Sequence, residues 1–113
     1  MEKSKFELIV AVVGGGYSEE VMKHAKAAGA RGGTVLHARG TGDSEIAKLF
    51  GLTIQPDKEM ILIVTPVKNK ENIMKAVAKG AGVSTEAQAI VFSMPLSDAV
   101  GIFNPDEGET EQK

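Results

Sequence analysis

Residues 32–42 join a short apolar strand to a glycine-hinged loop, in the order Gly-Gly-Thr-Val-Leu-His-Ala-Arg-Gly-Thr-Gly. Glycine at the two loop positions, Gly40 and Gly42, lets the backbone bend sharply and approach a ligand with its N–H groups uncovered. We interpret Gly40, Thr41 and Gly42 as a ligand contact, and the alternative is a simple flexible turn.

Two cations flank the segment that follows this strand. Arg39 precedes the segment and Lys58 follows its return, so both are placed to meet an anionic ligand, unless they are solvated surface charges. His37 shares a strand face with Arg39, because residues two apart point the same way. A metal site there would need Asp43 or Glu45 as well, and we expect His37 to be partnered or solvated and predict no metal site.

A second glycine run, Gly14, Gly15 and Gly16, joins a strand to the start of a helix, where a phosphate can bind. No Gly-x-Gly-x-x-Gly pattern follows, so we interpret the run as a plain connection. The sequence offers no Ser-His-Asp set, no nucleophile elbow and no paired carboxylates in an apolar setting. We therefore predict that the protein is not an enzyme.

Length and charge exclude several classes of protein. A chain of 113 residues forms one domain, and a formal net charge of −2 argues against a nucleic-acid partner. The absence of cysteine excludes disulfides and thiolate metal sites. The apolar run 8–13 is too short to cross a membrane. We expect a cytoplasmic protein that neither binds nucleic acid nor inserts into a membrane.

Runs of apolar and β-branched residues predict strands at 6–13, 34–38, 58–65 and 89–94. Two amphipathic stretches between them predict helices, one capped by Ser18 and the other by Asn69. We expect His24, in the middle of the first helix, to be solvated. The long connection 40–56 has room for a single helical turn at 44–49.

The order strand-helix-strand, repeated twice, predicts the α+β class and a ferredoxin-like βαββαβ sandwich. Its antiparallel four-stranded sheet would carry two helices on one face. Helices this rich in small residues cover part of a sheet, and the other face retains apolar side chains. We expect association between subunits to cover that face.

The chain resembles the PII (nitrogen regulatory) signalling proteins over about residues 6–103. The matching segments are Gly-Ala-Arg-Gly-Gly-Thr-Val at 29–35, Gly40-Thr41-Gly42, Pro56 with the strand after it, and Phe92-Ser93-Met94-Pro95-Leu96. The resemblance implies a homotrimer that binds adenine nucleotides in clefts between subunits. It also implies a domain over 1–103, in which 40–56 is the equivalent of the T-loop that contacts partners. We expect the acidic tail 104–113 to be disordered.

The resemblance also implies roles for single residues. Thr34 would meet the adenine edge, the backbone of Ile63 would read the base, and the loop-base residues would wrap the nucleotide. Apart from the resemblance, we expect Arg39 and Lys58, which flank the loop, to face its anionic part. We also include Gln88 and Ala89, at the start of the last strand. The ligand-binding set is thus Thr34, Arg39, Gly40, Thr41, Gly42, Lys58, Ile63, Gln88 and Ala89.

The chain departs from the family pattern at the cations that hold phosphate. Where the family has a basic residue after the second loop glycine, this chain has Asp43. Thr-Glu-Ala-Gln-Ala at 85–89 replaces a family loop that contains glycine and lysine. Gly101 and Phe103 stand where the family has a pair of arginines near the C-terminus. The tyrosine of the family's loop is also missing, since Tyr17 is the only tyrosine in this sequence. Because cations make the strong hydrogen bonds to phosphate, we expect ADP or AMP as the effector rather than ATP.

These features predict a signal-sensing regulator whose effector orders the 42–56 loop for docking on a transporter or a metabolic enzyme. Two alternatives stay open. One is a ligand-independent interaction module, and the other is a metal-binding trimer of related fold that uses His37. The docking surface would consist of the apolar loop residues Ile46, Leu49, Phe50 and Leu52.

Overall fold

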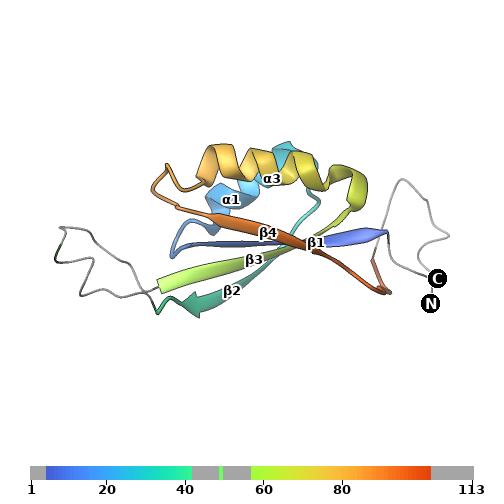
Figure 1. Cartoon of the computed structure of the whole chain (residues 1–113), viewed down its shortest axis with the longest axis horizontal. Coiled ribbons are helices and arrows are strands. Elements are labelled where there is room, and N and C mark those ends of the chain that lie inside the picture. Colours follow the sequence, from blue (N-terminus) through green and yellow to red (C-terminus); the bar gives the residue numbers. More distant parts are fainter. Residues whose placement is uncertain (1–4, 42–48, 50–56, 103–113) are drawn as a thin grey trace.

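The computed structural model describes residues 5–41, 49 and 57–102 of the chain. Its elements are β1 (Phe6–Gly14), α1 (Ser18–Ala27), β2 (Thr34–Arg39), β3 (Asp57–Pro66), α3 (Val67–Ala81) and β4 (Ile90–Pro95). The strands form one four-stranded antiparallel sheet in the order β2-β3-β1-β4. Both helices lie on the same face of this sheet (Figure 1). The predicted ferredoxin-like sandwich is confirmed.

The core lies between the sheet and the helices. Alternate residues of the two central strands face this core, and Ile9, Ile61 and Ile63 are fully buried there. The helices contribute a narrow stripe of small and β-branched side chains, which lets them approach the sheet closely. These are Val21 and Ala25 of α1 and Ile73, Val77 and Ala81 of α3.

Among the residues that the structure describes, no helix lies over the opposite face of the sheet (Figure 1). Residues directly opposite each other on antiparallel strands share a face, so the register defines rows of side chains across this uncovered face. One row is Leu36, Met60, Val12 and Ile90, and the next is Thr34, Leu62, Val10 and Phe92. Leu36, Phe92 and Ile90 are 44%, 42% and 60% exposed. A folded domain with such an apolar face is suited to association.

The helix starts differ from the sequence prediction. Ser18 is the first residue of α1, and the residue before it, Tyr17, makes no side-chain cap hydrogen bond. The α3 helix begins at Val67, directly after Pro66, so Asn69 lies within the first turn and is not the cap. The Val67 N–H donates to the carbonyl of Lys5 (3.0 Å), so the residue before β1 supplies the acceptor.

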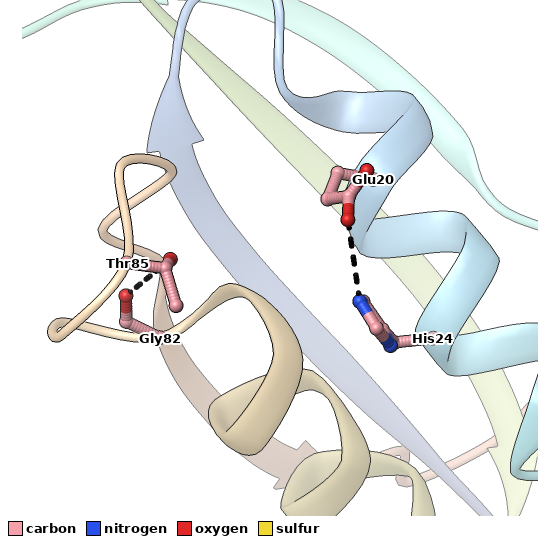
Figure 2. Close-up of polar contacts among 4 residues, drawn as sticks. All are labelled: Glu20, His24, Gly82 and Thr85. Carbon is pink, nitrogen blue, oxygen red and sulfur yellow. Dashed lines mark hydrogen bonds and ion pairs between the residues drawn. The ribbon is translucent and has the colours of Figure 1, made fainter.

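His24 is half-buried and therefore less solvated than the sequence suggests. Its side chain is 30% exposed and lies 3.4 Å from the Glu20 carboxylate (Figure 2). The imidazole also contacts α3 at Gly80, where a Cβ atom would clash with the ring. The two helices approach closely here because Gly80 has no side chain.

Several predictions fall outside the described residues. These are Gly42, most of the 42–56 segment with its expected helical turn, and the tail 104–113. The domain division at 103 is therefore still a prediction. In the part of the chain that the structure describes, no helix is long and apolar enough to cross a membrane.

Candidate functional site

Four segments that are distant in sequence meet where β2 ends and β3 begins. Ala38 pairs with Lys58, and Lys58 in turn pairs with Gly14 on its other side. The Gly14 N–H donates to the carbonyl of Ala87 (3.0 Å), just before β4. We call this region the loop end of the sheet, and it comprises residues 14–18, 38–41, 57–59 and 87–89 (Figure 1).

The turn between β1 and α1 has no backbone N–H left for a phosphate. The N–H groups of Gly14, Gly15 and Tyr17 donate to the backbone carbonyls of Ala87, Asp57 and Gly14, respectively. Those of Gly16 and Ser18 both donate to Glu59 Oε1. A phosphate loop requires such groups to be unpaired. These hydrogen bonds favour the interpretation of the glycine run as a plain connection.

The two candidate cations lie on opposite faces of the sheet. Arg39 pairs with Asp57, on the side that carries the helices. Lys58 is one residue further along β3 and therefore lies on the uncovered face, beside Ala38. One subunit thus does not bring Arg39 and Lys58 together on one anion.

His37 lies on the helix side, directly opposite Glu59 and two residues from Arg39. The described residues contain no group of three side chains suited to a metal ion. Asp43 and Glu45, which a metal site at His37 would need, lie outside the described residues.

Gln88 and Ala89 differ in what they offer a ligand. Gln88 is exposed and has a backbone φ of +52°, a region that residues other than glycine rarely adopt. The Ala89 side chain is buried, and its N–H donates to the carbonyl of Ala81 (2.8 Å). Of these two side chains, only that of Gln88 is thus available to contact a ligand.

Thr34 and Ile63 lie further along the strands. Thr34 begins β2, is exposed and pairs with Leu62, so it shares the uncovered face with Lys58. Ile63 is fully buried in the core, so only its backbone is available to a base. At the other end of β2, Gly40 is half-buried and Thr41 is exposed.

Comparison with known proteins places this geometry in a family. The model for the family "Nitrogen regulatory protein P-II" matches residues 6–105. The chain belongs to this family. A search of curated proteins finds no match to the sequence.

The solved structures agree in fold. The chain is similar to PII from Arabidopsis thaliana bound to citrate, with a TM-score of 0.65 and 23% identity over 97% of this chain and 92% of that one. It is also similar to a putative PII-like signalling protein from Thermus thermophilus, with a TM-score of 0.64 and 14% identity over 85% and 90% of the two chains.

Within this P-II chain, the segment that replaces the expected glycine- and lysine-containing loop is folded on itself. Thr85 donates to the carbonyl of Gly82 through both its backbone N–H (2.9 Å) and its hydroxyl (2.8 Å; Figure 2). The single tyrosine, Tyr17, packs against the core beside the β1–α1 turn. Of the predicted docking residues, Leu49 is 80% exposed, whereas Ile46, Phe50 and Leu52 lie outside the described residues.

Sequence reasoning missed Glu59, whose carboxylate is hydrogen-bonded at the start of α1. The signal was present in the alternation of β3. Glu59 has the same parity as Ile61 and Ile63, which face the core, so it is a charged residue on the helix side of a mostly apolar strand. A carboxylate in that position requires hydrogen-bond donors.

Proposed function

We propose that the chain is a signal-sensing regulator of the PII type, which binds adenosine mono- or diphosphate on the uncovered side of the loop end. Support comes from Thr34 and Lys58, which share this face. Thr34 pairs with Leu62, four residues from Lys58 along β3. At the rise per residue of a β-strand, the positions of Leu62 and Lys58 are about 13 Å apart, a length that an extended nucleoside mono- or diphosphate can bridge.

The distribution of charge favours this face over the helix side. On the helix side, the carboxylates of Asp57 and Glu59 stand opposite Arg39 and His37. These two acidic groups repel a phosphate, and Asp57 faces the permanent cation of Arg39. On the uncovered side, Lys58 stands beside Ala38 and opposite Gly14, with no carboxylate in its row. An anionic group is therefore best accommodated at Lys58.

A second subunit would complete the site. The uncovered face is apolar between Thr34 and Lys58, with Leu36 and Met60 in the row between them. An adenine ring bound there needs a second wall to exclude water, and a neighbouring copy on this face supplies one. The Arabidopsis PII structure, solved with citrate, shows that a protein of this fold binds a small anion.

The position of the proposed site supports control of a partner. Lys58 stands at the start of β3, directly after the 42–56 segment, which we propose contacts a transporter or a metabolic enzyme. Binding at Lys58 changes the partner's affinity only if the effector prefers one state of that segment. The protein would thus act as a regulator and not as an enzyme.

Calorimetry with AMP, ADP and ATP tests the proposal. We expect ADP or AMP to bind at least as tightly as ATP, because one lysine provides few charge-assisted bonds for a triphosphate. We expect Lys58→Ala to weaken ADP binding at least about tenfold, since a hydrogen bond to a charged group contributes about 1.5–3 kcal/mol. Arg39→Ala is the matched control, because it removes a cation from the opposite face of the same region, and its effect should be below about twofold.

Two results would contradict the proposal. A tenfold preference for ATP would mean that the phosphate-facing residues lie elsewhere. Absence of binding by any adenine nucleotide would favour the second candidate, a ligand-independent interaction module. The observation that favours this second candidate is Leu49, which is 80% exposed in an apolar stretch of sequence.

A further inference from the structure

The Glu59 carboxylate occupies the N-terminal end of α1. Its Oε1 atom accepts hydrogen bonds from the N–H groups of Gly16 (3.0 Å) and Ser18 (3.1 Å). The first N–H groups of a helix lack partners within the helix and form its positive end, so a carboxylate there is doubly favoured. The cap of α1 thus comes from β3, through Glu59, which lies 41 residues after Ser18 in the sequence.

The same turn is held by the strand backbone as well. The Gly15 N–H donates to the carbonyl of Asp57 (2.9 Å), at the first residue of β3. Three N–H groups of the β1–α1 turn are therefore bonded to Asp57 and Glu59, at the start of β3. Lys58, where we propose that the effector's anionic group binds, lies between the two residues that make these bonds.

On its other side the turn is bonded to the segment before β4. The Gly14 N–H donates to the carbonyl of Ala87 (3.0 Å), next to the exposed Gln88. The turn thus contacts both flanks of the loop end, the start of β3 on one side and residues 87–89 on the other.

We propose that Glu59 is a positioning residue that couples these two flanks. Its carboxylate fixes the β1–α1 turn to the start of β3, so a shift of β3 at Lys58 moves the turn and, through Gly14, moves residues 87–89. Glu59 itself does not touch the effector, because it lies on the helix side of the sheet. This inference rests on the proposed function only in naming the effector; the coupling itself can be measured without a ligand.

Two substitutions at Glu59 separate coupling from general stability. Glu59→Gln keeps an oxygen acceptor of the same shape and removes the charge, so it should retain the fold with weaker bonds. Glu59→Ala removes the acceptor. Glu71→Ala is the control, because Glu71 is an exposed carboxylate on α3 that pairs with Lys75.

Residue-resolved amide hydrogen exchange by NMR, without ligand, gives the first readout. We expect Glu59→Ala to speed exchange about tenfold at Gly16 and Ser18 and also at Gly14, whose own bond to Ala87 is untouched by the substitution. Glu59→Gln should show the same pattern with smaller changes, and Glu71→Ala should show none. Faster exchange at Gly16 and Ser18 alone would overturn the coupling, as would a uniform increase over the whole chain in both Glu59 variants.

Calorimetry with ADP gives the second readout. We expect Glu59→Gln to raise the Kd for ADP about threefold, with Glu71→Ala unchanged. An unchanged Kd in Glu59→Gln would overturn the link between coupling and binding. Wild-type protein that binds no ADP would contradict the proposed function, and in that case the exchange pattern at Gly14 alone decides the coupling.

Discussion

At the scale of single residues, the register of β2 and β3 separates side chains that look equivalent in the sequence. Arg39 and Lys58 flank one segment, and the sequence correctly indicates that they stand close to each other at its base. Which face each one takes depends on the pairing of Arg39 with Asp57, and this register is fixed only once the strands are assembled. The sequence therefore proposes which residues form the candidate site, and only the register gives their geometry.

The left-handed backbone of Gln88 leads to a prediction at this scale. A residue with a side chain at a φ of +52° carries a strain of about 1 kcal/mol, which glycine does not. Gln88→Gly should therefore leave the free energy of unfolding unchanged or raise it by up to about 1 kcal/mol. If the Gln88 side chain contacts the effector, ADP affinity should fall at the same time, which calorimetry and urea unfolding measure together. Reduced stability with unchanged affinity would show that Gln88 has a purely structural role.

At the scale of elements, strands were easier to predict than helix ends. Each strand's apolar run predicted its position to within one residue at either end, because β-branched residues and alternate burial are properties of the strand itself. Ser18 and Asn69 are suitable cap residues, yet neither caps its helix. The first N–H groups of α1 and α3 bond to Glu59 and Lys5, which lie far away in the sequence, so local pattern alone did not contain the answer.

The contact between the two helices leads to an element-scale prediction. Alanine is favoured over glycine inside a helix by about 1 kcal/mol, so Gly80→Ala should stabilise α3 unless its methyl group meets a neighbour. Here the methyl group meets the His24 ring. We expect Gly80→Ala to stabilise the His24→Ala variant by about 1 kcal/mol and to give no gain in the wild-type background. Thermal or urea unfolding of the four proteins in a double-mutant cycle measures this coupling. An equal gain in both backgrounds would mean that the ring moves aside without loss.

At the scale of the whole molecule, the two helices that the structure describes cover one face of the sheet and leave the other without a helix. The helices bury one face, whereas the other presents apolar rows that run from β2 across to β4. The sequence predicted this asymmetry from the small residues of the helices and the apolar residues of all strands. It did not predict which side chains form each row, because that again requires the register.

This uncovered face leads us to predict a homotrimer. Light scattering at micromolar protein should give about three times the 11.9 kDa of one chain. Phe92 lies on the uncovered face and is 42% exposed in the single chain, and burying a side chain of this kind contributes about 1.5–3 kcal/mol. Phe92→Lys should therefore shift the protein to monomers, because it replaces that gain with a buried charge. Ala78→Lys is the matched control, since it adds the same charge at an exposed position of α3, and it should remain a trimer. A monomeric wild type, or trimers in both variants, would show that this face is not the interface.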